Sequence, residues 1–294
     1  MLDDAKASFR RGTLYVAATP LGNLADITLR ALAAFDAADI VLAEDTRVTG
    51  QLLTRYGIRT QLVSVREHNE RGMADKVVGW LAEGKLIVQV SDAGTPAVSD
   101  PGARLARTVR DAGYAVSPLP GPSAVVAALS ASGTQCDRWR FLGFLSPKRK
   151  ARCDAIAAIA DCRDAVVIYE APHRLIECVT DLVDVLGAER IIVLARELTK
   201  TFETIQRLPA AELAAFIAAD PNQCRGEIAL IIEPAVASED EDDDTESRRL
   251  LEILLDEKLP VKQASQIVSR MTGANRKALY ELALSIRAQD DDQD

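Results

Sequence analysis

The sequence predicts an α/β protein of two domains, followed by a small helical domain. β-branched apolar runs alternate with helical patterns over most of the chain, which favours α/β domains with largely parallel strands. An acidic segment, Ser238–Glu246, interrupts this alternation, and only helical patterns follow it. The chain has 294 residues, and at roughly 100–200 residues per domain it has room for two domains and a smaller third.

The first α/β domain is expected over residues 12–118. Its predicted strands are Leu14–Ala18, Ile40–Ala43, Leu86–Val90 and Ala115–Pro118. Its predicted helices are Ile27–Ala38, Thr46–Tyr56, Met73–Glu83 and Ala103–Ala112. Gly84 and Gly113 are placed to end the helices before them. Asp100-Pro101 reads as an N-cap followed by a first-turn proline.

The second α/β domain is expected over residues 119–236. Its predicted strands are Arg140–Phe144, Ala165–Tyr169, Arg190–Ala195 and Glu227–Ile232. Its predicted helices are Pro147–Ala160, Pro172–Leu186 and Pro209–Ala218.

Residues 237–246 are expected to form a flexible linker, because acidic runs without Lys or Arg are usually solvated and disordered. Residues 247–288 are expected to form three short helices. Val261–Ser269 and Arg276–Leu284 are separated by MTGAN, whose Gly273 and Asn275 suit a tight turn and a helix cap. This spacing is typical of a helix-turn-helix. A nucleic-acid contact and a plain packing role both remain open for this segment.

Composition bounds the function. The net charge is −9, but 11 acids lie in Ser238–Glu246 and Asp290–Asp294, and the remainder has 33 acids against 35 bases. A net charge of +2 there permits RNA binding without demonstrating it. Five cysteines without a CxxC and two histidines favour reduced cytosolic thiols over disulfides or a metal site. No signal peptide or membrane-length apolar run is visible, so we expect a cytoplasmic protein without a membrane partner.

Two loops are candidates for ligand binding. There is no GxGxxG after the first strand and no P-loop. Instead, Thr19–Asn23 and Ser91–Pro96 follow two of the predicted parallel strands, at the sheet edge where such folds place ligands. Gly22 and Gly94 would let a ligand approach the backbone. From spacing alone, two ordinary Gly/Pro turns explain these loops equally well.

A resemblance makes the prediction more specific. TLYVAATPLGNLADITLRAL, AEDTR at Ala43–Arg47, SDAGTPAVSDPG at Ser91–Gly102 and PLPGPSAVVAALSASG at Pro118–Gly133 resemble the tetrapyrrole methylase superfamily. The segments REHNE, GFLSPKRKAR, YEAPHRL, ARELTKTFE and RGEIALII resemble its ribosomal RNA small subunit methyltransferase I branch. The resemblance covers about residues 12–287, in order.

The resemblance implies an S-adenosylmethionine-dependent enzyme that methylates the ribose 2′-oxygen of a cytidine in the decoding region of small-subunit ribosomal RNA. It also implies a homodimer, and a cofactor cleft between the two α/β domains. The family usually has Gly-Asp-Pro where this chain has Gly94-Thr95-Pro96, which weakens any role for a carboxylate there. The residues carried over as cofactor-binding are Pro20, Leu21, Gly22, Asp92, Ala93, Gly94, Thr95, Val98, Ser123, Ala124, Phe144, Glu170, Leu198, Gly226, Glu227 and Ile228.

Methyl transfer from a sulfonium requires in-line alignment of the acceptor oxygen and removal of its proton, and no metal. The candidate proton acceptors are Glu44, Asp45, His68, Glu70, Glu170, His173 and Lys200. His68 is placed equally well to cap the following helix, and His173 to pack at a helix start. The sequence therefore does not single out the base.

Basic residues provide candidate contacts to RNA phosphates. Lys148, Arg149, Lys150 and Arg152 form a dense run at a helix start, which could also be a solvated helix face. The other candidates are Arg47, Arg174, Arg276 and Lys277. The expected partner is small-subunit ribosomal RNA within the 30S particle, with the target nucleotide single-stranded or extruded.

Two other functions remain open. One is a methylase of the same superfamily that acts on a tetrapyrrole or small molecule, against which the basic run and the tail argue. The other is a DNA-binding regulator in which the helical tail binds DNA and the α/β part senses a ligand. The tail is short and only mildly basic, which argues against this reading.

Overall fold

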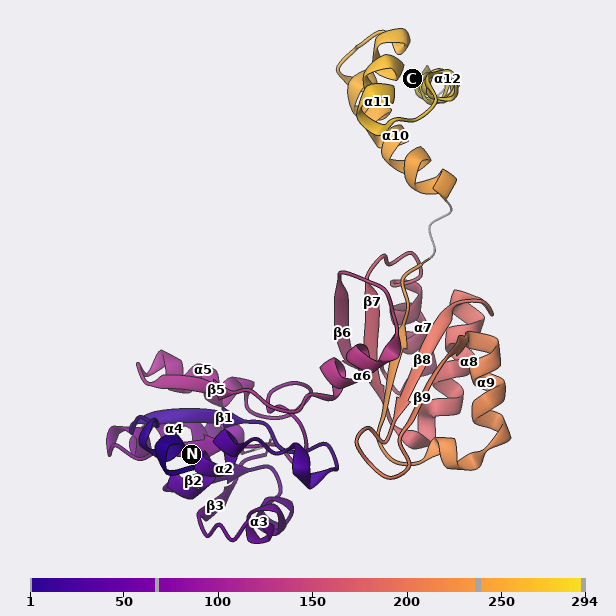
Figure 1. The fold of residues 1–294 in the computed structure, drawn as a ribbon. Coiled ribbons are helices and arrows are strands. Elements are labelled where there is room, and N and C mark those ends of the chain that lie inside the picture. Colours follow the sequence, from indigo (N-terminus) through magenta and orange to yellow (C-terminus); the bar gives the residue numbers. More distant parts are fainter. Residues whose placement is uncertain (1, 67–68, 236–238, 292–294) are drawn as a thin grey trace. The chain divides into compact units, whose positions relative to one another are not determined.

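The structure, a computed structural model, describes residues 2–66, 69–235 and 239–291. It divides into two compact units, residues 1–234 and 235–294. The first unit contains two five-stranded sheets with their helices, and the second is helical (Figure 1).

All strands of the first sheet are parallel. The sheet has the order β3-β2-β4-β1-β5 and is formed by β1 (Thr13–Ala17), β2 (Ile40–Ala43), β3 (Gln61–Ser64), β4 (Ile87–Gln89) and β5 (Ala115–Leu119). The accompanying helices are α1 (Leu2–Ala7), the short 3₁₀ turn η1 (Leu24–Asp26), α2 (Leu29–Ala37), α3 (Thr46–Arg55), α4 (Glu70–Ala82) and α5 (Ala103–Asp111).

Successive residues of the first sheet's strands enter different cores. Tyr15 and Val88 pack with Phe35 of α2 and Leu53 of α3 on one face of the sheet. Leu14 packs with residues of α4 and α5 on the other. A sheet buried on both faces reads in sequence as continuous apolar runs, which explains why β1, β2 and β4 were predicted correctly.

The structure of this part differs from the sequence prediction at three points. The edge strand β3 was not predicted, because its residues are only partly buried and its apolar signal is weak. α1 was not predicted either; it buries no residue. Finally, Asp100 does not cap α5, which begins after Gly102. The α5 cap comes from a residue distant in sequence: Glu70 Oε1 accepts from the backbone N–H groups of Gly102 at 3.1 Å and Leu105 at 2.8 Å.

The second sheet is mixed. Its order is β6-β7-β10-β8-β9, with β6 parallel to β7 and the other pairs antiparallel. The strands are β6 (Trp139–Phe144), β7 (Ala165–Glu170), β8 (Ile191–Arg196), β9 (Thr204–Pro209) and β10 (Ile228–Ile232). The helices are α6 (Ala124–Ser132), α7 (Arg149–Ala157), η2 (Pro172–Arg174), α8 (Leu175–Leu186), α9 (Ala210–Ala219) and η3 (Pro221–Cys224). β9 and α6 were not predicted.

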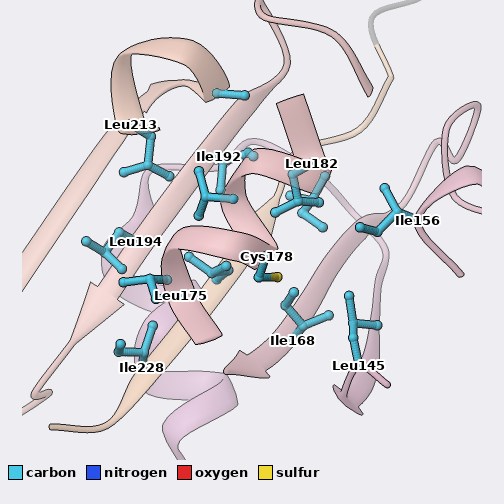
Figure 2. Packing of buried hydrophobic residues seen from close by; sticks show 14 of the residues in the cluster. Leu145, Ile156, Ile168, Leu175, Cys178, Leu182, Ile192, Leu194, Leu213 and Ile228 are labelled. Atoms are coloured by element: carbon cyan, nitrogen blue, oxygen red, sulfur yellow. The ribbon is translucent and has the colours of Figure 1, made fainter. Parts of the chain in front are cut away.

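The two faces of the second sheet differ in side-chain size. Figure 2 shows the large aliphatic face, where Ile168, Ile192 and Leu194 pack against Leu182 of α8 and Leu213 of α9. The opposite face is built from smaller residues, including Ala165, Ala195 and Ala229, and packs against α6 and Leu21. The small side chains leave room beside this face.

The second unit has its own apolar core. It contains α10 (Glu239–Asp256), α11 (Val261–Thr272) and α12 (Arg276–Asp291), packed around residues such as Leu251, Val268 and Leu279. Gly273, at φ +81°, ends α11, and Asn275 Oδ1 accepts from Lys277 N at 2.8 Å at the start of α12. The predicted turn and cap are confirmed. The expected linker differs, because α10 already begins at Glu239 and includes most of the acidic run.

Candidate functional site

A cavity of about 440 Å³ lies at the carboxyl ends of strands from the first sheet, beside the small-residue face of the second. Its lining comes from the ends of β2, β4 and β7, the loop after β1, and the segments around Ser123, Leu198 and Gly226. It is lined by Leu21, Glu44, Asp92, Ala93, Gly94, Thr95, Val98, Ser99, Asp100, Ser123, Ala124, Phe144, Tyr169, Glu170, Ala171, Pro172, Ala195, Leu198, Gly226, Glu227, Ile228 and Ala229.

The loops after β1 and β4 are hydrogen-bonded to each other. Thr19 and Gly94 exchange two backbone hydrogen bonds of 2.9 Å, and Thr19 Oγ1 donates to Ser91 O at 3.1 Å. Thr95 Oγ1 donates to Pro122 O at 2.9 Å, which ties the β4 loop to the start of the second part. Gly94 has φ +74°, a conformation that strongly favours glycine. This wall of the cavity is therefore preorganised.

A hydrogen-bonded cluster of Glu197, Lys200 and Glu227 holds the lining segment at Gly226 in place. Glu197 Oε1 accepts from Lys200 Nζ at 2.8 Å and from Glu227 N at 2.9 Å, and Lys200 also lies 3.2 Å from Glu227 Oε2. Gly226 has φ +81°, and a Cβ there would lie 2.1 Å from Glu197 Oε1. Glycine at this position is required both by the backbone conformation and by the space that Glu197 occupies.

Strained backbone is concentrated in these loops. Of five non-glycine residues with positive φ among those described, four are Ala97 and Ser99 after β4, and Glu197 and Thr199 after β8. Each such residue costs about 1–3 kcal/mol, and such residues cluster at functional sites. The strain supports the view that this cavity is used.

The cavity is acidic. Its lining includes Glu44, Asp92, Asp100, Glu170 and Glu227, but no Lys, Arg or His among the described residues. Burial, with the nearby charges of Asp92 and Asp100, raises the pKa of Glu44. Burial and the charge of Asp92 likewise raise the pKa of Asp100, against the opposing effect of a hydrogen bond from Ser91. Such a site favours a cationic ligand.

Aromatic rings lie at one side of the cavity. Phe144, 55% exposed, meets Tyr169 edge-on with ring centroids 5.6 Å apart. Burial, with the charge of Asp100, raises the pKa of Tyr169 to about 12, so the phenol stays neutral. The two rings therefore offer apolar ring surfaces beside the carboxylates.

The predicted cofactor residues are largely brought together. Fourteen of the sixteen line this cavity, and Pro20 and Gly22 instead line a neighbouring cavity. Seven further lining residues were not predicted: Ser99, Asp100, Tyr169, Ala171, Pro172, Ala195 and Ala229. Asp100 lies within SDAGTPAVSDPG, and its interpretation as a helix cap hid its position at the cavity.

The catalytic candidates separate by their contacts. Asp45 caps α3 and pairs with Arg47 Nη2 at 2.5 Å, and Arg47 holds the pKa of this carboxyl well below its usual range. Glu70 caps α5, as described above. His173 is exposed in η2 and does not line the cavity, and His68 lies outside the described residues.

Three further candidates lie at or beside the cavity. Lys200 belongs to the hydrogen-bonded cluster with Glu197 and Glu227. Burial lowers the pKa of Lys200, but the hydrogen bond to Glu197 outweighs this effect and raises it, so Lys200 keeps its proton. Glu170 is buried, and its Oε1 lies 2.5 Å from Arg174 Nη2. Glu44 lines the cavity and forms no ion pair with a described residue.

The basic run requires one correction. Arg152 is 2% exposed and pairs with buried Asp181 at 2.7 Å, so it cannot reach an external phosphate. Arg149 is exposed but binds Asp181 and Asp184. Lys148 and Lys150 are exposed at the start of α7. Arg276 and Lys277 are exposed at the start of α12.

Two further structural findings concern the described residues only. No helix among them combines the length and apolarity needed to cross a membrane. Nor do His, Cys, Asp or Glu side chains in this part of the chain gather in a group that could hold a metal ion.

Comparison with known proteins identifies the class. The family model described as tetrapyrrole (corrin/porphyrin) methylases matches residues 13–214, so the chain belongs to this family. The model described as the RsmI C-terminal HTH domain matches residues 241–287.

Relatives narrow the assignment within the family. Ribosomal RNA small subunit methyltransferase I of Neisseria meningitidis serogroup B is 51% identical, over 97% of both chains. The protein of the same name from Escherichia coli O157:H7 is 46% identical, over 97% of this chain and 99% of its own.

Solved structures support the fold. The cobalamin biosynthetic enzyme cobalt precorrin-4 methyltransferase matches with a TM-score of 0.57 and 17% identity, over 77% of this chain and 98% of its own. The methyltransferase CobJ matches with a TM-score of 0.58 and 20% identity, over 76% and 95%. At these identities, the likeness shows the fold alone.

Proposed function

We propose that this protein transfers the methyl group of S-adenosylmethionine to the ribose 2′-oxygen of a cytidine in small-subunit ribosomal RNA. The observation that carries the proposal is the acidic cavity, set in a chain that is about half identical to proteins named ribosomal RNA small subunit methyltransferase I.

The residues of the cavity fit the cofactor. S-adenosylmethionine carries a sulfonium and an ammonium group, and five carboxylates line the cavity without a cation among the described residues. Leu198, Ile228 and Ala229 supply apolar surface for a nucleoside. Glu170 Oε2 is buried without a hydrogen-bond partner, and such an orphaned acceptor is stabilised by a donor from a ligand. The volume lies within the range of small-molecule sites.

The protein's own residues supply positioning and proton transfer. When bound, the cofactor supplies an electrophilic methyl group. The hydrogen bonds between Thr19 and Gly94 hold the backbone of the two loops in place before the cofactor binds. Alignment of well-oriented reactants lowers the activation barrier by up to roughly 7–11 kcal/mol. Glu44 accepts the proton of the 2′-hydroxyl, because its carboxylate lines the cavity without a described cation paired to it and its raised pKa makes it a better base.

The proposal extends to the substrate particle, the oligomeric state, the cellular location and the RNA contacts. The substrate is the 30S particle, the working form is a homodimer, and the location is the cytoplasm. The relatives' names support the ribosomal substrate, and the homodimer rests on the resemblance to the superfamily. Lys148, Lys150, Arg276 and Lys277 contact RNA phosphates, which is supported by their exposure. Residues 12–118, 119–236 and 247–288 act as domains of this enzyme.

The test is methyl transfer with purified components. The protein is incubated with isotopically labelled S-adenosylmethionine and 30S particles from cells that lack this enzyme, and the modified nucleotide is mapped by mass spectrometry. A 2′-O-methylcytidine in the small-subunit RNA is expected. Label on another nucleotide, or on no RNA, would contradict the proposal.

A further inference from the structure

A second cavity adjoins the first. It has a volume of about 290 Å³ and is lined by Thr19, Pro20, Gly22, Leu24, Val48, Thr49, Gln51, Leu52, Arg55, Ser91 and Asp92. The loop after β1 is a shared wall, since Leu21 lines the first cavity while Pro20 and Gly22 line the second. Asp92 lines both. A ligand in each cavity would therefore meet its neighbour at this carboxylate.

The charges of the two cavities are complementary to different ligands. The charged side chains that line the first cavity are all carboxylates, whereas Arg55 lines the second. Arg47, Gln51 and Arg55 are spaced by four residues along α3, so they lie on one face of the helix. All three are exposed. This row offers an amide and two guanidinium groups, of which Arg47 is already held by Asp45. Guanidinium groups are well suited to phosphate.

The cavity also carries an unsatisfied polar group and an apolar wall. Thr49 is 2% exposed, and its Oγ1 has no hydrogen-bond partner among the described residues. Leaving a buried hydroxyl unsatisfied is unfavourable, which points to a partner outside the chain. Val48 and Leu24 are 44% and 43% exposed at the same cavity. Two exposed aliphatic side chains beside polar groups suit the flat face of a base.

We infer that this second cavity binds the acceptor nucleotide, with the base inside, the phosphate at Arg55 and the ribose at the boundary marked by Asp92, facing the first cavity that Glu44 lines. The inference rests on the proposed function and deepens it by naming the acceptor subsite. The volume of about 290 Å³ is just below the usual range of ligand pockets, so the site has room for no more than one nucleotide. That nucleotide must leave its stack to enter. A ribose at this boundary presents its 2′-oxygen to the first cavity.

The test is a substitution on the surface of α3 that fills the second cavity with a large side chain. Val48→Trp places a large side chain in the second cavity from an exposed position, and Thr54→Trp is the matched control, because Thr54 is exposed on the same helix but does not line the cavity. Three quantities are measured for each: thermal unfolding, S-adenosylhomocysteine affinity by calorimetry, and kcat/KM for 30S particles. We expect Val48→Trp to lower kcat/KM at least a hundredfold while the cofactor product binds unchanged, and Thr54→Trp to stay within about threefold of the parent.

A second measurement does not depend on activity. Cytidine 5′-monophosphate is titrated into the protein saturated with S-adenosylhomocysteine, and binding is followed by ligand-observed NMR. Binding should be lost in Val48→Trp, kept in Thr54→Trp and weakened at least fivefold in Arg55→Ala.

The outcomes separate the inference from the proposed function. Equal kcat/KM in Val48→Trp and the parent, or equal nucleotide binding, would overturn the acceptor site. If the parent fails to methylate 30S particles but its nucleotide binding depends on Val48 and Arg55, the site stands and the proposed function is wrong. If the parent binds no nucleotide up to tens of millimolar, the acceptor site is wrong.

Discussion

Gly226 is the position where one added methyl group should disturb the cavity most. An alanine at φ +81° costs about 1–2 kcal/mol in backbone strain. Its Cβ would also lie 2.1 Å from Glu197 Oε1, so the carboxylate must turn away. It then loses its hydrogen bonds from Lys200 and from the backbone of Glu227. Bonds to charged groups contribute roughly 1.5–3 kcal/mol each, part of which solvent restores. We expect Gly226→Ala to lower the free energy of unfolding by about 3–5 kcal/mol.

Gly113→Ala is the matched control. Gly113 has φ +85° and nothing within 4 Å of a built Cβ, so it carries the strain without the clash and should lose only about 1–2 kcal/mol. Urea denaturation of both variants gives the difference, and calorimetry with S-adenosylhomocysteine should show at least tenfold weaker binding for Gly226→Ala alone. Equal losses of stability in the two variants would refute the reasoning, because the Glu197 contacts would then contribute nothing.

Four further predictions follow from single features of the structure. Glu44→Gln should lower kcat at least a hundredfold, a larger effect than its loss of cofactor affinity, to which the other four lining carboxylates still contribute. In the parent, the rate should rise with pH through the raised pKa of Glu44, and an unchanged pH profile in the variant would argue against this base. Gly94→Val should abolish S-adenosylhomocysteine binding in calorimetry while circular dichroism stays native, since φ is +74° there. Lys148→Ala with Lys150→Ala should weaken 30S binding and reduce its salt dependence in filter binding, with Lys76→Ala as a control on α4. Thr49→Val should raise the free energy of unfolding by about 1 kcal/mol in urea titrations, because it removes an unsatisfied hydroxyl; a loss of stability would show that the hydroxyl is bonded.

Local signals in the sequence predicted much of the fold. β1, β2, β4, β7 and β10 are continuous apolar runs because they are buried on both faces, and such runs are visible without knowledge of the partners. Glycines with positive φ at the ends of α4, α5 and α11 were found from position alone. Edge strands β3 and β9 were missed, since burial on their faces is partial and depends on neighbours.

Motif resemblance, rather than periodicity, located the cofactor residues in the sequence. Fourteen of the sixteen line one cavity although they come from segments as distant as Leu21 and Ile228. Local pattern alone gave no reason to join these segments, because their proximity arises from how the two sheets pack.

Tertiary contacts decided the roles of the charged residues. In sequence, Glu44, Asp45 and Glu70 are equivalent candidate carboxylates, and Arg152 is one of four bases in a run. In the structure, Asp45 and Glu70 cap helices, Arg152 is buried against Asp181, and Glu44 lines the cavity. A charged side chain acts according to the partners within a few ångströms and its access to solvent, and for these residues both are set by segments distant in the chain. The sequence by itself therefore determined the class of fold and the segments that form the site, while only the folded chain decided which carboxylates are free to act.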